Sequence, residues 1–257
     1  MKIKNIGKTY KFDKNGYLIK KHIKSKIKRK WLKPINDTVN RLVKEFENKI
    51  HSIYLRGSVA SGACVDNISD IDILVMSHYE DDNDIVMKPN RYKQFNIRYL
   101  NREITKKYPF VEKVDISTGV AANITPASIG FNFAIKHQCA HLFGQNLQKK
   151  IEPFKKDEIP IYNYQLNGFI QKCERWGGVP QNICKRMIRY AFESIFDEVN
   201  IYTRDLYPCY KTFTDIHPEK KDIMEIILKQ AILPTTDNSN FKEIIEFSKW
   251  LNKKINK

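Results

Sequence analysis

Two aspartates stand two positions apart in an apolar segment, Asp70 and Asp72 in the run SDIDILV at residues 69–75. Side chains alternate along a strand, so the two carboxylates point to one face, about 7 Å apart along the strand. Carboxylates placed in this way can share two divalent ions. Mg²⁺ suits them, because it is a hard cation held by one or two carboxylates together with substrate phosphates. The spacing therefore predicts metal-assisted phosphate chemistry at these aspartates.

A glycine and a serine come before the aspartates, at the end of an earlier apolar strand. The strand reads Ile53-Tyr54-Leu55, and Gly57-Ser58 follows it after one arginine, Arg56. Glycine lets a backbone approach a phosphate closely, and the serine adds a hydroxyl donor. Gly57 and Ser58 are therefore candidate phosphate ligands.

The whole pattern resembles the signature of the nucleotidyltransferase superfamily. It consists of Gly57-Ser58, a spacer of eleven residues, and Asp70-x-Asp72 inside an apolar strand. That superfamily includes DNA polymerase beta, kanamycin nucleotidyltransferase and the minimal nucleotidyltransferases. The resemblance implies a nucleoside triphosphate substrate, two Mg²⁺ ions, and contact of Gly57 and Ser58 with the β- and γ-phosphates. It also implies a third metal-binding carboxylate on a neighbouring strand. The candidate for this third carboxylate is Asp115, in an expected strand over residues 111–117. Glu112, whose side chain would point to the opposite face of that strand, is the second choice.

The net charge of +16 is concentrated near the start of the chain. Residues 1–33 hold thirteen Lys or Arg and one acid, Asp13, and so carry +12 of that charge. A basic patch can bind RNA or polyphosphate. Few aromatic residues interleave with the lysines of residues 20–30, which argues against base stacking. A solvated lysine-rich face is the favoured interpretation.

Cysteine usage and hydropathy restrict the class of protein further. The five cysteines are scattered, odd in number and form no C-x-x-C pair, which argues against a disulfide framework and a structural zinc site. No apolar run approaches the roughly 18 residues of a membrane-spanning helix, and the basic N-terminus lacks the apolar core of a secretory signal. We therefore expect a cytoplasmic protein with no membrane partner.

The order of elements predicts an α+β fold with two domains. Residues 1–150 should form a nucleotidyltransferase catalytic domain with a basic N-terminal segment, its mixed sheet flanked by helices. Its first helix should start near Pro34, after a hairpin or turn at Asn15-Gly16. Residues 149–160 are charged, contain two prolines and are expected to link the domains. Beyond them the apolar spacing is helical throughout, so residues 151–257 should form a helical substrate-binding domain of four or five helices.

A catalytic domain followed by a helical bundle resembles the aminoglycoside adenylyltransferases more than the polymerases. This resemblance implies transfer of AMP from ATP to a hydroxyl of a small acceptor such as an aminoglycoside-like antibiotic. Lys185 and Arg189, four positions apart on an expected helix, are candidate triphosphate ligands, and the resemblance makes Glu193 the candidate general base. Two alternatives stay open: a transferase acting on tRNA or protein, and a degenerate module that binds nucleotides or RNA. The intact Asp70-x-Asp72 pair speaks against the degenerate module.

Overall fold

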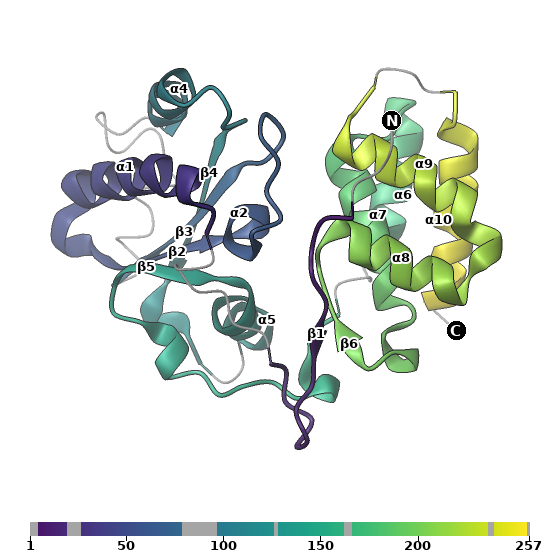
Figure 1. Ribbon diagram of the computed structural model, residues 1–257, viewed down its shortest axis with the longest axis horizontal. Coiled ribbons are helices and arrows are strands. Elements are labelled where there is room, and N and C mark those ends of the chain that lie inside the picture. Colours follow the sequence, from purple (N-terminus) through teal and green to yellow (C-terminus); the bar gives the residue numbers. More distant parts are fainter. Residues whose placement is uncertain are drawn as a thin grey trace. The chain divides into compact units, whose positions relative to one another are not determined.

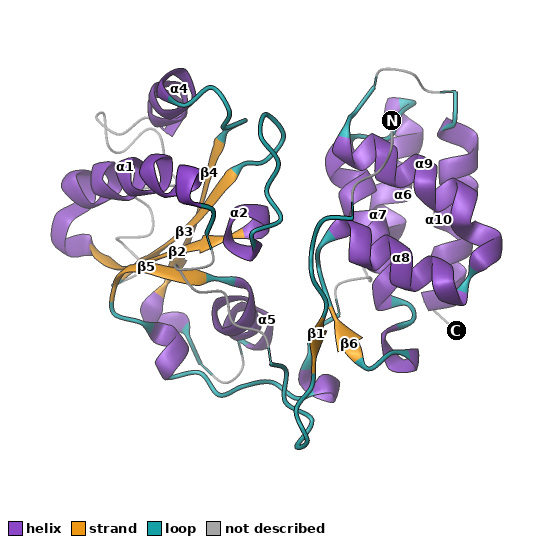
Figure 2. Cartoon of the chain, viewed as in Figure 1, coloured by secondary structure: helices purple, strands orange, loops and turns teal. Residues whose placement is uncertain are grey.

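A computed structural model describes residues 5–19, 27–78, 97–125, 128–161, 166–235 and 239–255 (Figures 1 and 2). The chain divides into two compact units. Residues 14–160 form one, which we call the sheet unit, and residues 1–13 join residues 161–257 in the other, which we call the helical unit. The α+β fold expected from the sequence is confirmed. The sequence analysis assigned residues 1–13 to the catalytic domain, whereas their contacts place them in the helical unit.

A four-stranded mixed sheet, in the order β4-β3-β2-β5, forms the centre of the sheet unit. Strands β3 and β4 are parallel, and β2 is antiparallel to both β3 and β5. The strands are β2 (Ile50–Arg56), β3 (Ile71–Ser77), β4 (Val114–Val120) and β5 (Ala140–Gly144). The expected strand over 111–117 is thus observed three residues later along the chain, and Asp115 lies inside it.

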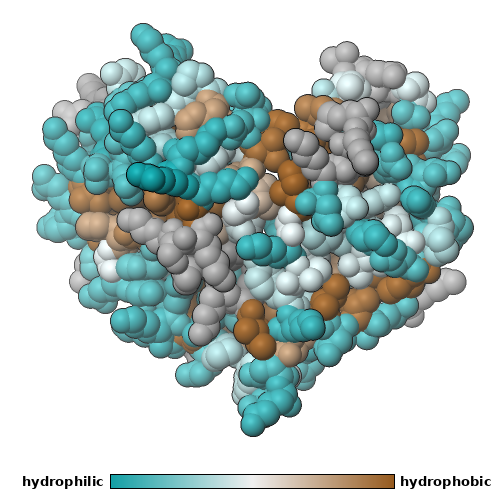
Figure 3. Space-filling view, in the orientation of Figure 1, coloured by the Kyte–Doolittle hydropathy of each residue, from teal (hydrophilic) through white to brown (hydrophobic). Residues whose placement is uncertain are grey.

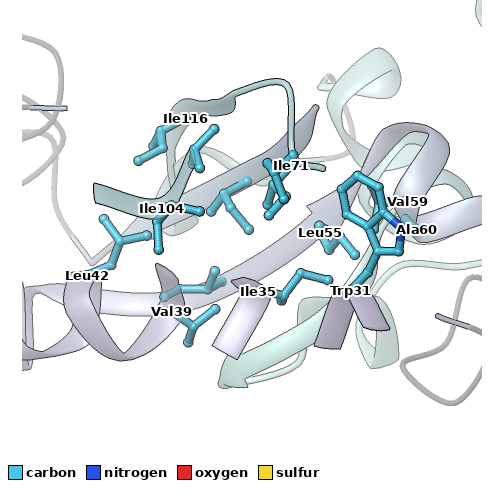
Figure 4. Close-up of a cluster of buried hydrophobic side chains, with 14 of the residues drawn as sticks. Trp31, Ile35, Val39, Leu42, Leu55, Val59, Ala60, Ile71, Ile104 and Ile116 are labelled. Carbon is cyan, nitrogen blue, oxygen red and sulfur yellow. The ribbon is translucent and has the colours of Figure 1, made fainter. Parts of the chain in front are cut away.

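Two apolar clusters pack against opposite faces of this sheet. On one face, helices α1 (Arg29–Phe46) and α4 (Ile97–Lys107) cover alternate residues of the strands, as Figure 4 shows for Ile35, Ile71 and Ile104. The other face, which includes Leu74, is covered by α5 (Ile129–Phe133) and the π-helical turn Ala134–Gln138. Figure 1 shows α1 and α5 on opposite sides of the sheet. Hydrophilic side chains cover the visible side of α1 in Figure 3.

Helix α1 begins at Arg29, five residues before the expected start near Pro34. Trp31 is fully buried and packs edge-on against Phe110, so the burial of a large side chain favours the additional turn. Pro34 cannot donate a backbone hydrogen bond, but Thr38 Oγ1 donates to the carbonyl of Pro34 at 2.8 Å. Tertiary packing therefore outweighs the helix-breaking tendency of the proline.

The helical unit contains five α-helices among its described residues. They are α6 (Leu166–Trp176), α7 (Gln181–Glu193), α8 (Leu206–Ile216), α9 (Lys221–Ile232) and α10 (Phe241–Ile255). Pro180 and the helical spacing after it predict a helix from there to about Tyr202, but α7 ends at Glu193 and Tyr202 lies in a strand. None of the helices in the described part of the chain is long and apolar enough to cross a membrane.

The start of the chain is attached to the helical unit through a short antiparallel strand pair. Strand β1 (Tyr10–Lys11) pairs with β6 (Ile201–Tyr202). Thr203 Oγ1 donates to the carbonyl of Lys8 at 2.8 Å, and the amide of Lys8 donates to Asp205 Oδ2 at 2.9 Å. These hydrogen bonds join residues nearly 200 positions apart in sequence.

The Asn15-Gly16 turn forms, but its flanking segments do not pair with each other as a hairpin. Tyr10 and Lys11 pair with β6, whereas Tyr17 bridges to Lys155 in the sheet unit. A hairpin is stabilised by cross-strand pairs between its own arms. Here the segment before the turn pairs within the helical unit and the segment after it pairs within the sheet unit. The turn therefore lies where the chain crosses from one unit to the other.

Replacing Thr203 by Val should destabilise the protein by about 1–2 kcal/mol, because it removes a buried donor to Lys8 and an acceptor for the amide of Asp205. Chemical denaturation followed by circular dichroism measures the change. Thr105→Val is the control, since Thr105 bonds only within α4 and should change stability by less than about 0.5 kcal/mol. Equal effects of the two substitutions would contradict a structural role for the strand attachment.

Candidate active site

Three carboxylates from two adjacent parallel strands lie on the same side of the sheet. Asp72 is directly paired with Asp115 across β3 and β4, and Asp70 precedes β3 by one position. Ile71 and Ile116, at the opposite parity, lie in the cluster beneath α1 and α4. Strand alternation therefore turns the aspartates toward the face that carries Leu74 and Met76. Strand register therefore places Asp70, Asp72 and Asp115 on one face of the sheet, whereas Glu112 is exposed before β4 starts. Their role as a shared set of metal ligands stays a prediction.

Asp72 has a pKa well above the ordinary range of a carboxyl group. Its pKa is raised to about 6, mainly by burial, and the negative charges of Asp70 and Asp115 raise it further. The positive charges of Arg56 and Lys113 act in the opposite direction. A carboxylate with a pKa so far above its ordinary value, beside two further acids, marks a candidate functional site.

The turn after β2 lies directly against Asp72. Gly57 has φ of +74°, and a Cβ at this position would overlap Asp72 Oδ2, so only glycine fits without moving the carboxylate. Gly57 also begins α2 (Gly57–Ser61), where Ser58 Oγ donates to Ser69 Oγ at 3.1 Å. Ser69 Oγ in turn accepts from the amide of Val65 at 2.9 Å. The Gly57-Ser58 turn is thereby fixed to the segment that leads into the Asp70-x-Asp72 strand.

Two cations flank the carboxylates. Arg56 is the cross-strand partner of Asp72 on β2. Lys113 Nζ lies 3.5 Å from Asp70 Oδ2. Partial burial acts to lower the pKa of Lys113, but Asp70, Asp115 and Asp72 together raise it above its ordinary value. The sequence analysis did not identify Lys113, although its position two residues before Asp115 gives it the same strand parity.

By the chemistry of their oxygens, though not by their present spacing, the three carboxylates suit a hard divalent cation. Three carboxylates supply oxygen ligands of the kind that Mg²⁺ takes, and a positive ion would offset the burial and the neighbouring negative charges that raise the pKa of Asp72. Over the ranges that the structure describes, no group of three His, Cys, Asp or Glu side chains is gathered so that it could hold a metal ion. Assignment of Mg²⁺ to Asp70, Asp72 and Asp115 stays a prediction supported by the chemistry of the side chains.

The remaining candidates lie in the helical unit, within a charged cluster on α7 and the segment after it. Arg189 Nε donates to the carbonyl of Arg204 at 3.1 Å, and Arg204 Nη1 donates to Glu193 Oε1 at 3.2 Å. Burial lowers the pKa of Arg189, and the neighbouring charge of Arg204 lowers it further. Lys185, one helical turn before Arg189, is partly buried. The structure therefore joins Arg189 and Glu193 through Arg204, which the sequence analysis did not identify.

Comparison with solved structures finds a similar fold in a spectinomycin adenyltransferase, AAD(9), from Enterococcus faecialis, determined with ATP and spectinomycin. The TM-score is 0.57 at 13% sequence identity, and the match covers 88% of this chain and 99% of that one. The likeness shows a shared fold and agrees with the predicted α+β architecture, a mixed sheet flanked by helices and followed by a helical part. No model of a known protein family matches the chain. No curated protein matches it either.

Replacing Asp72 by Asn should stabilise the metal-free protein at pH 7.5 by about 1–3 kcal/mol. The pKa of Asp72 is about 6 in the fold, against 3.8 as its ordinary value, so the folded state holds this proton more tightly than the unfolded chain. As pH rises from about 4 to 6, the unfolded chain loses the proton first, and the fold loses stability through this group. Above about pH 6 the stability lost through Asp72 no longer changes with pH.

Denaturant titrations in EDTA between pH 4 and 8 measure this effect, and the advantage of Asp72→Asn should shrink toward pH 4. Asp66→Asn is the control, because Asp66 is an exposed carboxylate paired with Lys30 outside the cluster. An Asp72→Asn protein that is no more stable than the native chain at pH 7.5 would show that the carboxylates do not strain the fold.

Proposed function

We propose that the chain is a metal-dependent nucleotidyltransferase that moves a nucleoside monophosphate, AMP from ATP, to a hydroxyl of a small acceptor such as an aminoglycoside-like antibiotic. The observation that carries this proposal is the grouping of Asp70, Asp72 and Asp115 beside the Gly57-Ser58 turn. The fold shared with an adenyltransferase solved with ATP and spectinomycin supports it.

The carboxylates and the turn have separate tasks in this reaction. Asp70, Asp72 and Asp115 would hold two Mg²⁺ ions, which when bound neutralise the triphosphate and activate the acceptor oxygen. Gly57 would let the backbone of the turn approach the β- and γ-phosphates close beside Asp72, because a side chain here would overlap Asp72 Oδ2. Ser58, which lies against Ser69, would keep the turn in place, and its hydroxyl would turn from Ser69 to donate to a phosphate oxygen of the bound nucleotide.

In the helical unit, Lys185 and Arg189 are proposed to bind the triphosphate, and Glu193 to accept the proton of the acceptor hydroxyl. Arg189 is a partly buried cation one helical turn after Lys185, which supports the first role, since a partly desolvated guanidinium attracts a phosphate more strongly than one in water. For Glu193, the hydrogen bond from Arg204 to Oε1 fixes the orientation of the carboxylate. A base must be held in place before it can accept a proton efficiently.

Transfer to tRNA or protein is the alternative, and its main support was the basic start of the chain. Two of those lysines already have partners within the sheet unit. Lys28 Nζ donates to the carbonyl of Cys64 at 2.7 Å, and Lys30 pairs with Asp66 while lying over the ring of Phe110. Both lysines thus fasten α1 to residues 64–66, the loop that follows α2. These contacts favour a structural role for them, and with it a small acceptor.

Incubation with ATP labelled at the α-phosphate tests the proposed function and its alternative together. The acceptors are a panel of aminoglycoside and aminocyclitol antibiotics, bulk tRNA and the protein itself, each with and without Mg²⁺. Mg²⁺-dependent label on an antibiotic supports the proposal. Label on tRNA or protein would replace the small acceptor by the alternative, and no transfer to any acceptor would overturn the assignment as a transferase.

Asp70→Asn and Asp72→Asn should each lower the transfer rate by about 10²-fold or more, because each removes a charge that holds the ions and offsets the triphosphate. Rates with the labelled acceptor measure the loss, and circular dichroism checks the fold. Asp66→Asn, outside the carboxylate group, should transfer at close to the native rate. Near-native turnover by a folded Asp72→Asn chain would refute the catalytic role of this aspartate.

Gly57→Ala should lower the transfer rate by about 10²-fold, since the added methyl overlaps Asp72 Oδ2 and displaces the carboxylate from the site. Gly16→Ala is the matched control: Gly16 has φ of +82°, and an added Cβ meets no atom within 4 Å. Both substitutions cost about 1 kcal/mol of backbone strain, but only the first disturbs Asp72. If the two variants lose activity equally, the loss comes from strain and not from the carboxylate.

A further inference from the structure

Lys113 shares the face on which the three carboxylates lie. The parallel pairing of β3 with β4 aligns Ile71 with Val114 and Asp72 with Asp115. One position earlier, the amide of Ile71 donates to the carbonyl of Lys113 at 2.8 Å, so the ladder continues to the segment that holds Asp70 and Lys113. Alternation from Asp115 then gives Lys113 the parity of the carboxylates. The face therefore carries acids at three neighbouring positions and a cation at the fourth.

The contact of Lys113 with Asp70 is loose. Lys113 Nζ lies 3.5 Å from Asp70 Oδ2, and the side chains are 50% and 24% exposed. Ion pairs of this length and exposure contribute little to stability, because water screens them and the long lysine side chain loses freedom on pairing. A contact that adds little stability can also be displaced easily. What it does supply is a positive charge beside acids that repel one another.

The second cation of the site is held differently. Arg56 belongs to β2 itself and is the ladder partner of Asp72, so its backbone is fixed against β3. Lys113 lies just before β4 begins, and half of its side chain faces solvent. Of the two positive charges, Lys113 is the more exposed, so its side chain moves more readily into water.

We propose that Lys113 is the resident counter-cation of the carboxylate face: it stands beside Asp70 while no metal is bound, gives way when a divalent ion binds, and thereby weakens divalent affinity. The inference rests on the proposed function, which assigns metal binding to Asp70, Asp72 and Asp115. It makes Lys113 a positioning residue that sets the ion concentration at which the site fills. In the absence of metal, its charge limits the repulsion among the acids.

Binding of Mn²⁺ alone, measured by calorimetry without nucleotide, tests the inference. Lys113→Met removes the charge and keeps most of the side-chain length, and it should bind Mn²⁺ about three- to tenfold more tightly than the native chain, as loss of one repelling charge a few ångströms from a divalent ion predicts. Lys113→Arg keeps the charge and should restore native affinity. Lys107→Met is the matched control, because Lys107 is a half-exposed lysine of the same unit that pairs with Asp37, outside the carboxylate group.

Tighter Mn²⁺ binding by Lys113→Met, with native affinity in Lys113→Arg and Lys107→Met, supports the proposal. Unchanged or weaker binding by Lys113→Met, while the native chain binds Mn²⁺ and transfers AMP, overturns this inference and leaves the proposed function standing. A native chain that neither binds Mn²⁺ nor transfers AMP overturns both. An equal gain in Lys107→Met would show a general charge effect and would also overturn the role of Lys113.

Discussion

Burial of one carboxylate beside two others is the constraint on which the candidate site depends. Asp70, Asp72 and Asp115 face one another across two parallel strands, and burial together with the repulsion between the carboxylates raises the pKa of Asp72 to about 6. Side chains left to themselves would turn apart into water. They are held together because each is part of a strand or its immediate start, where the direction of a side chain is fixed by the backbone. The fold thus stores unfavourable electrostatic energy at the place where a cation would release it.

The opposite face of the same strands supplies the compensating stability. Ile71, Ile73 and Ile116 alternate with the aspartates and are buried under α1 and α4. A fully buried aliphatic side chain contributes on the order of 2 kcal/mol, so a few of them outweigh the cost of a strained carboxylate. Val59 and Ala60 of α2 belong to the same cluster as Trp31 of α1. The core that stabilises the sheet therefore also holds the Gly57-Ser58 turn against Asp72.

The helical unit has its own buried charges and its own fixing point. Arg189, Arg204 and Glu193 form a linked set, and Asp205, next to Arg204, accepts the amide of Lys8 from the start of the chain. Thr203, between β6 and that charged set, holds the carbonyl of Lys8. The first described residues thereby fix the segment that carries Arg204, although the rest of this unit begins some 150 positions later. Sequence distance gives no indication of this arrangement.

The sequence by itself determined the features that depend on near neighbours. Strand alternation placed Asp70 and Asp72 on one face, the apolar setting of Asp115 placed it in a strand, and helical spacing after residue 160 predicted the helices of the second unit. Only the tertiary structure decided which distant segments meet: β1 with β6, Lys113 with Asp70, and Arg189 with Glu193 through Arg204. It also decided that α1 starts before Pro34, because burial of Trp31 outweighs a local signal. The physical reason is that periodicity and turn chemistry act over a few residues, whereas strand pairing and ion pairing depend on which surfaces the folded chain brings together.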